Sequence, residues 1–475
     1  MTSFRHLAAP TLATVASGLA IFFSMGLAGT VAPGPGVLWA LALVAPVPVL
    51  WFAFRAERGW AGFAAAFAAY VIGSANILPA YGHVLPLPVL ALAILTPALG
   101  FALSTLGARY VMRRVTPVTG VFAFAFLWTG CDYLLSLGPN GAAASPAYAQ
   151  LSLPAMVQIA SLVGLWGVSL VVALVAAAAA MAVATRQRTF VWLALGVLAL
   201  NLGYGAWRIE TAPRTTPITI GLAADDDLVP LRFKNDAASA LKVVDAYTAA
   251  AQRLAGSSLI VFPERVAVLK PEWQERFHAS LRHLAVSRSA AVVIGVDDRA
   301  VPRSNAAYFY FSNGAPPLTY AKRHLIPGLE SVFTPGGKSF MTSDFTALAV
   351  CKDMDFPDDL RAEAMLQPSL FAVPAWDFVR DGDWHARLAI MRGVENGFAV
   401  ARAANNGILS VSDAYGRVIA AKSTAIGGMV TLSATVARGP GRTLYAAIGD
   451  ELPQIALAMA LLLIGVAVAG PKRRV

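Results

Sequence analysis

Long apolar runs alternate with short polar loops over the first 208 residues of the chain. Each run approaches the ~20 residues that an α-helix needs to cross a bilayer. The first run follows Arg5 and resembles a secretory signal, but several more runs follow it, so we interpret it as a retained helix. The pattern predicts a domain of seven membrane spans in residues 1–208, at 10–31, 36–54, 60–79, 86–107, 118–137, 157–184 and 189–207.

Basic residues fall in alternate loops of this region, whereas the loops after the first, third and fifth spans contain no Lys or Arg. Positive charges accumulate on the cytoplasmic side of membrane proteins. The pattern therefore predicts a cytoplasmic N-terminus and an extracytoplasmic position for everything after the seventh span. The basic positions are Arg5, Arg55, Arg58, Arg109, Arg113, Arg114, Arg186 and Arg188.

Residues 209–440 follow a different pattern, in which short β-branched runs alternate with amphipathic segments. Runs such as SLIVFPE, AAVVIGVD and LFAVPAW predict strands, and residues 236–255 and 271–289 predict helices. This alternation predicts a layered α/β domain outside the membrane. A last apolar run in residues 451–475 ends in a basic tail and predicts an eighth span, which agrees with the same orientation.

The composition also indicates a membrane protein, since 57% of the residues are hydrophobic and only 13% are charged. Soluble domains have about 25% charged residues. The net charge of +10 lies largely in the predicted cytoplasmic loops, so we expect no binding to nucleic acid. Two cysteines, Cys131 and Cys351, cannot form a disulfide framework, and the six histidines show no metal-binding spacing. We therefore expect neither a metal site nor a cofactor.

Three candidate catalytic residues each follow a strand-like run in the α/β domain. Glu264 ends SLIVFPE, Lys322 lies in YAKRHLIP, and Cys351 ends FTALAVC. Taken singly, a free Cys usually packs in a core, and a lone Glu or Lys is usually a solvated charge. Together they supply a base for a thiol whose usual pKa is ~8.5, and a cation for the thiolate and an oxyanion. The backbone N–H of Lys352 is a candidate second oxyanion donor.

The order FPE, YAKRHLIP and a strand ending in Cys resembles the nitrilase, or carbon–nitrogen hydrolase, superfamily. With the predicted spans, nearly the whole chain resembles the apolipoprotein N-acyltransferase family, including residues 145–175, 375–397 and 402–419. This resemblance implies an αββα sandwich with a Glu264–Lys322–Cys351 triad. It also implies an active-site role for Glu330, in orienting Lys322 or assisting the base.

The resemblance further implies that Trp376 and Asp377 border the pocket. Three departures from the family pattern touch that pocket. Arg265 follows the base where a small residue is usual, Gly328 and Leu329 exchange the bulky and small positions before Glu330, and Lys352 and Asp353 replace an aromatic residue and a Glu after the nucleophile. These departures leave the triad chemistry intact and bear on the substrate.

The family resemblance implies an enzyme of the bacterial inner membrane that moves an acyl chain from phospholipid, through a Cys351 thioester, to an amine. The amine would be the N-terminus of a diacylated lipoprotein, and we expect the enzyme to act as a monomer. An amidase tethered to the membrane, with water as acceptor, is one alternative, and transfer to a different amine is another. A scaffold or transporter is a third, although the predicted spans carry few charges, Asp132 being the clearest.

Overall fold

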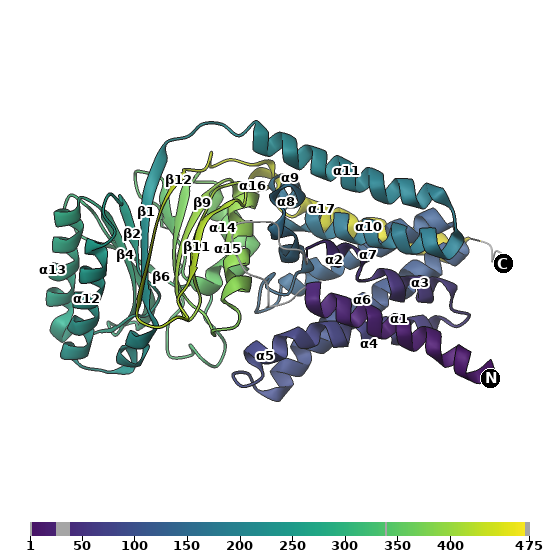
Figure 1. Ribbon diagram of the computed structural model, residues 1–475, viewed down its shortest axis with the longest axis horizontal. Coiled ribbons are helices and arrows are strands. Elements are labelled where there is room, and N and C mark those ends of the chain that lie inside the picture. Colours follow the sequence, from purple (N-terminus) through teal and green to yellow (C-terminus); the bar gives the residue numbers. More distant parts are fainter. Residues whose placement is uncertain (1, 25–38, 338–339, 471–475) are drawn as a thin grey trace. The chain divides into compact units, whose positions relative to one another are not determined.

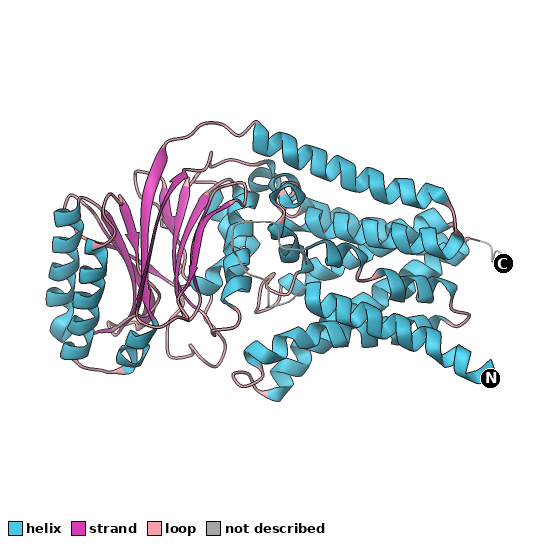
Figure 2. Ribbon diagram, viewed as in Figure 1, coloured by secondary structure: helices cyan, strands magenta, loops and turns pink. Residues whose placement is uncertain are grey.

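The computed structural model describes residues 2–24, 39–337 and 340–470. Within these residues the chain forms two compact units, one made of the residues up to Ala212 and from Ile448 onward, the other of Pro213–Ala447. Figures 1 and 2 show that the first unit is helical and the second contains all the described strands. The structure therefore separates an apolar helical unit from an α/β unit, and each is described by itself below.

Six described helices or helical segments of the first unit are long and apolar enough to cross a membrane: Gly59–Tyr81, Leu87–Arg114, Pro117–Ser136, Leu165–Thr185, Arg188–Glu210 and Glu451–Ala469. They contain the helices α4 (Gly59–Ser74), α5 (Leu78–Tyr81), α6 (Leu87–Arg114), α7 (Pro117–Ser136), α10 (Leu165–Thr185), α11 (Arg188–Glu210) and α17 (Glu451–Ala469). The other helices before Pro213 are α1 (Thr2–Ser24), of which the apolar stretch is Ala9–Ser24, and the short helices α2 (Trp39–Val44), α3 (Val47–Arg55), α8 (Pro154–Val157) and α9 (Ala160–Val163).

The first two expected spans, 10–31 and 36–54, extend into residues 25–38, which lie outside the described residues. The total of eight spans therefore stays a prediction. The expected span at 157–184 is not one continuous helix. Gly164 adopts a φ of 72° at the end of α9, so the helix breaks there and α10 begins at Leu165. A periodicity argument could not locate this break, because the apolar run continues through it.

The α/β unit is a four-layer sandwich of helices, sheet, sheet and helices (Figure 1). One sheet has the strand order β12-β1-β2-β4-β5-β6, with β3 paired to β4, and the other has the order β11-β10-β9-β8-β7. Helices α12 (Ala237–Gln252) and α13 (Pro271–Arg288) cover the first sheet, and α14 (Pro357–Ala364) and α15 (Gly382–Asn396) cover the second. This arrangement confirms the layered α/β domain predicted from the alternating pattern.

The strands are short and mostly buried, as expected for sheets covered on both faces. Their bounds are β1 (Pro217–Asp225), β2 (Leu259–Val261), β3 (Val268–Leu269), β4 (Ala291–Asp298), β5 (Ser304–Tyr310), β6 (Leu318–Ala321), β7 (Thr346–Leu348), β8 (Leu370–Trp376), β9 (Ala399–Asn405), β10 (Ile408–Ser412), β11 (Val418–Ser423) and β12 (Met429–Ala437). One apolar cluster fills the space between the sheets and includes Leu222, Val261, Ala372 and Ala401. This shared core fixes the ends of β2, β6, β7 and β8, where the candidate site lies.

Candidate active site

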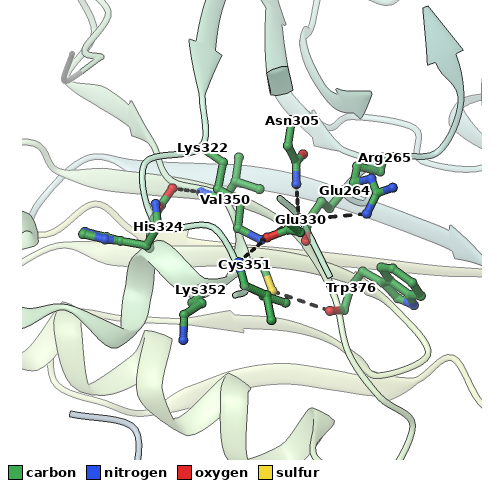
Figure 3. A network of polar contacts seen from close by, with 12 residues as sticks. Glu264, Arg265, Asn305, Lys322, His324, Glu330, Val350, Cys351, Lys352 and Trp376 are labelled. Atoms are coloured by element: carbon green, nitrogen blue, oxygen red, sulfur yellow. Dashed lines mark hydrogen bonds and ion pairs between the residues drawn. The ribbon is translucent and has the colours of Figure 1, made fainter. Parts of the chain in front are cut away.

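Glu264 and Lys322 form a buried ion pair. Glu264 lies three residues after β2 and is 2% exposed, and Lys322 directly follows β6 and is 1% exposed. The Lys322 ammonium Nζ lies 2.9 Å from Glu264 Oε1 and 2.9 Å from Glu330 Oε2 (Figure 3). The structure therefore brings together three of the four residues predicted to be catalytic.

Asn305, on β5, holds the two carboxylates in place. Its amide Nδ2 donates to Glu264 Oε1 at 2.6 Å and to Glu330 Oε1 at 2.7 Å. The backbone N–H of Ile326 donates to the other Glu330 oxygen at 2.8 Å. Buried carboxylates need such partners, because an uncompensated charge in this environment is costly. Asn305 was not among the predicted site residues, because nothing in its local sequence distinguishes it from an ordinary strand residue.

Cys351, the fourth predicted catalytic residue, begins a turn of 3-10 helix, η4 (Cys351–Asp355), soon after β7. Its φ of 46° lies in the left-handed region, which a non-glycine residue rarely adopts. Strained backbone of this kind is found preferentially at functional sites. The thiol Sγ is 3.5 Å from the carbonyl oxygen of Trp376 and donates to it. The abrupt turn holds the sulfur at the edge of the buried sheet instead of inside it.

The charges around Cys351 favour a protonated thiol at rest. Burial raises its pKa well above the usual range, and the Glu264 carboxylate raises it further, whereas the Lys322 ammonium lowers it. Burial alone would raise the pKa of Glu264, but the Lys322 charge and the hydrogen bonds from Lys322 and Asn305 bring it below its usual value. Burial lowers the pKa of Lys322, but Glu264, Cys351 and Glu330 more than reverse this. The pair is therefore Glu264⁻ with Lys322⁺.

Asp353 lies in η4, the turn that begins at Cys351, and connects this turn to the segment after Lys322. It is completely buried, and its Oδ2 accepts from the Val350 N–H at 3.0 Å and from the Tyr320 hydroxyl at 2.8 Å. Its Oδ1 accepts from the backbone N–H groups of Arg323 at 3.1 Å and His324 at 2.8 Å. These contacts give Asp353 a positioning role between Cys351 and Lys322.

Lys352 is also buried, with its Nζ 3.9 Å from Asp355 Oδ2 and 5.7 Å from the centre of the Phe356 ring. Figure 3 shows its side chain directed away from the Glu264–Lys322 pair. Asp355 in turn lies 3.8 Å from His385 on α15. The two residues after the nucleophile thus contact protein groups in this structure, and their predicted role in binding substrate stays a prediction.

Trp376 ends β8, and its ring lies beside two arginines. The guanidinium carbon of Arg265 is 5.8 Å from the centre of this ring, and that of Arg232 is 3.0 Å from it. Arg265 has a φ of 50° and its Nη1 lies 4.0 Å from Glu330 Oε1. Arg265 and Trp376 therefore lie next to the triad, whereas Arg232, from a distant part of the sequence, was not predicted.

Asp377 is buried and forms a two-bonded ion pair with Arg402 of β9. Its oxygens accept from Arg402 Nη1 at 2.9 Å and from Nη2 at 2.5 Å. Burial raises the pKa of Asp377, and the Arg402 charge opposes this rise. This ion pair holds the segment that follows Trp376 against β9. Among the described residues, no group of three or more His, Cys, Asp or Glu side chains could hold a metal ion.

Two family profiles match the chain in succession. The profile described as apolipoprotein N-acyltransferase N-terminal domain matches residues 25–178, and that described as carbon-nitrogen hydrolase matches residues 228–452. A carbon-nitrogen hydrolase from Helicobacter pylori G27 is a similar solved structure, with a TM-score of 0.39 and 17% identity, covering 52% of this chain and 94% of its own.

Two curated relatives carry the same name. The apolipoprotein N-acyltransferase of Brucella melitensis biotype 1 is 28% identical over 403 residues, which cover 73% of this chain and 73% of the relative. That of Shewanella oneidensis is 24% identical over 525 residues and covers 98% of both chains. Both profiles and both relatives thus agree with the resemblance drawn from the triad and the apolar runs. The chain belongs to the apolipoprotein N-acyltransferase family.

Proposed function

We propose that this protein is a membrane enzyme that transfers an acyl chain from a phospholipid to an amine, namely the N-terminus of a diacylated lipoprotein. The observation that carries the proposal is the buried ion pair of Glu264 and Lys322 in the same unit as the buried Cys351 thiol, whose charge interactions include both residues. The names of the relatives support the reaction class. Glu264, Lys322, Cys351 and Glu330 are the residues to which we assign the chemistry.

In the first step the Cys351 sulfur attacks the ester carbonyl carbon of the phospholipid. Glu264 takes the thiol proton as the carbon–sulfur bond forms, because a thiol with a raised pKa is a poor nucleophile without a base. The carbon–oxygen bond then breaks, and Glu264 gives the proton to the departing alcohol oxygen. The products are an acyl-thioester on Cys351 and a lysophospholipid.

Lys322 stabilises the negative oxygen that forms during this attack. Its ammonium has three N–H donors. Glu264 and Glu330 each accept from it at 2.9 Å, which leaves the third donor for the substrate oxygen. The backbone N–H of Lys352 is the second proposed donor. A fixed positive charge in a buried site stabilises such an oxygen far more than it would in water.

In the second step the acceptor amine attacks the thioester carbonyl. Glu264 takes a proton from the amine nitrogen, the carbon–sulfur bond breaks, and the proton returns to the Cys351 sulfur. The products are an amide and the resting thiol. Because the donor leaves before the acceptor reacts, ping-pong kinetics are expected.

The helical unit suits substrates that are lipids. Its six long apolar helices support a multi-pass position in the bacterial inner membrane. We propose eight spans in total, with residues 209–440 on the extracytoplasmic side and the tail of 451–475 in the cytoplasm. An acyl chain could then reach Cys351 from the bilayer. We propose that a monomer suffices, since every residue assigned to the chemistry lies in one unit.

Intact mass spectrometry of the detergent-purified protein after incubation with phospholipid tests the proposal. The native protein should gain the mass of one acyl chain, and adding a diacylated lipopeptide should remove it and yield a triacylated product. Cys351→Ala should gain nothing, and Cys131→Ser, which retains the nucleophile, should behave like the native protein. If the folded native protein forms no adduct but hydrolyses amides, the enzyme is an amidase and the transfer is excluded.

A further inference from the structure

Arg232 is a buried cation that no hydrogen bond satisfies within the described part of the chain. It lies in a turn of 3-10 helix, η3 (Asp226–Phe233), and is 3% exposed. Its Nε, Nη1 and Nη2 atoms all lack a partner among the described residues. Leaving a guanidinium in this state is costly, since buried charges in proteins are normally paired. The cost suggests that Arg232 is kept for an anion that binds there.

The neighbours of Arg232 leave its donors free. Its guanidinium carbon lies 3.0 Å from the centre of the Trp376 ring and 4.7 Å from that of Phe233. Aromatic faces attract a cation, but guanidinium N–H groups point outward in the plane of the group and cannot be satisfied by a ring stacked on it. Asp226, in the same turn, accepts from the Asn406 N–H at 2.8 Å and so ties η3 to the loop after β9. Arg232 is therefore held in place with its donors unused.

A second arginine flanks the same indole. The guanidinium carbon of Arg265 lies 5.8 Å from the centre of the Trp376 ring, and its Nε also lacks a partner among the described residues. Burial, and then the charge of Arg265, lower the pKa of Arg232 to about 9. The indole Nε1 of Trp376 is a third buried donor for which the described residues provide no acceptor. The indole of Trp376, which carries one unsatisfied donor, thus lies beside two arginines from other segments of the chain that carry further unsatisfied donors.

This cluster adjoins the nucleophile. The carbonyl of Trp376 accepts from the Cys351 thiol at 3.5 Å, so one residue joins the donor cluster to the sulfur. Figure 3 shows Arg265 and Trp376 on one side of the Cys351 centre and His324 on the other. An anion bound by the arginines would therefore lie on the Trp376 side of Cys351.

We propose that Arg232, Arg265 and the indole N–H of Trp376 form a subsite for the phosphodiester of the phospholipid donor. The inference rests on the proposed function and names the group that orients the donor. Guanidinium groups match the oxygens of a phosphate, and such charge-assisted hydrogen bonds are stronger in a buried site. The acceptor is an amine whose protonated form two arginines would repel, so the cluster fits the donor and not the acceptor. Phosphate binding would hold the ester carbonyl near Cys351.

The test compares two acyl donors in the full-length protein in detergent, phosphatidylglycerol and diacylglycerol, which lacks the phosphate. Acyl-thioester formation is followed by intact mass spectrometry. The native protein should prefer phosphatidylglycerol. Arg232→Gln should reduce this preference about ten- to hundredfold, the range expected for losing hydrogen bonds to a charged group. Arg232→Lys keeps the positive charge but lacks the planar guanidinium group, so it should retain part of the preference for phosphatidylglycerol.

Arg276→Gln is the matched control, because Arg276 is an exposed arginine on α13 outside the site. It should keep the native preference, and thermal unfolding should show Arg232→Gln to be folded. An unchanged preference in Arg232→Gln, even with both rates reduced, would overturn the subsite alone. Absence of any adduct in the native protein would instead overturn the proposed function, and the donor subsite with it.

A competition arm separates a lipid headgroup from free phosphate. Glycerophosphoglycerol, the deacylated headgroup of phosphatidylglycerol, should slow thioester formation in the native protein and not in Arg232→Gln. Inorganic phosphate at the same ionic strength should be the weaker competitor. If phosphate competes equally well or better, the cluster is a general phosphate site and the headgroup assignment fails.

Discussion

Cys351 differs from the usual picture of an activated cysteine, in which a cation holds a thiolate ready. Burial and the Glu264 carboxylate both raise the pKa of its thiol, and Lys322 offsets them only in part. We therefore expect the thiolate to form only when a base removes the proton during attack. Such a site protects the nucleophile from oxidants and alkylating reagents, which react with the thiolate. Under the proposed mechanism, turnover then depends on Glu264 as the base.

The alkylation rate of Cys351 should report this protonation state. In a Cys131→Ser background, we expect the rate with iodoacetamide to rise about tenfold per pH unit up to about pH 9 without a plateau, since only the thiolate reacts. Glu264→Gln should abolish acyl transfer yet speed alkylation at any given pH. The Glu264 carboxylate raises the pKa of the thiol, so removing this charge lowers the pKa and increases the thiolate fraction. Intact mass spectrometry measures both rates.

The control for this prediction is Glu275→Gln, which removes an exposed carboxylate on α13 that pairs with Arg282. It should leave both the alkylation rate and the transfer rate unchanged. A rate that bends near pH ~8.5 and then levels off in the native protein would mean that Cys351 titrates like a free thiol. Slower alkylation in Glu264→Gln would mean that Glu264 acts mainly as a base even toward iodoacetamide.

Only some site residues could be predicted from the sequence. Glu264, Lys322 and Cys351 could be predicted because each follows a recognisable apolar run. The end of a strand is where a side chain can leave the core. Asn305 and Arg232 carry no such signal, since one lies inside a strand and the other in a short 3-10 turn. Their roles arise from sheet pairing and from the packing of η3, which bring together positions far apart in the chain.

At the scale of elements, the positions of Cys351 and Lys322 depend on the η4 turn and on the loop that contains Gly336. Asp353 accepts from the Val350 N–H and from the N–H groups of Arg323 and His324, so it connects the η4 turn to the backbone next to Lys322. The loop after Glu330 then packs against β6, where the Gly336 N–H donates to the Lys322 carbonyl at 2.9 Å. The strands at these positions were predicted, but their short lengths were not, because the apolar runs continue beyond the hydrogen-bonded pairs.

Gly336→Ala tests how tightly this loop holds Lys322. A Cβ at Gly336 would lie 2.1 Å from the carbonyl oxygen of Ala321, so the backbone next to Lys322 must shift. We expect a loss of stability of about 1–3 kcal/mol from overpacking. The acyl-transfer rate should fall by about a hundredfold, since misplacing a catalytic group by an ångström has effects of that size. Thermal unfolding and the thioester assay measure the two effects.

Gly337→Ala is the matched control, one residue further along the same loop. A Cβ at Gly337 meets no described atom within 4 Å, so both stability and rate should stay near native. Equal effects of the two substitutions would show that the loop needs glycine flexibility and does not position Lys322 through this contact.

At the scale of the whole molecule, the side of the membrane on which the α/β unit lies depends on whether an odd or an even number of membrane-crossing helices precedes it. Five of the six long apolar helices precede Pro213, and each is long enough to cross the membrane once. If all five cross, Arg58, just before the first of them, and the α/β unit lie on opposite sides. The side of Arg58 relative to the α/β unit does not depend on the first two predicted spans, because both precede Arg58. Arg58, Arg113, Arg114, Arg186 and Arg188 then share one side, as the positive-inside rule requires.

Single cysteines in a Cys131→Ser, Cys351→Ser background test this topology with a membrane-impermeant maleimide on intact spheroplasts. His83→Cys, in the loop before α6, and Glu272→Cys, on α13, are exposed and should react without permeabilisation. Arg58→Cys is equally exposed but lies one crossing away from His83, so it should react only after the membrane is opened. Labelling of Arg58→Cys and His83→Cys from the same side would mean that Gly59–Tyr81 does not cross. Labelling of Glu272→Cys only after permeabilisation would place the α/β unit in the cytoplasm, where a lipoprotein acceptor on the outer face of the membrane could not reach Cys351.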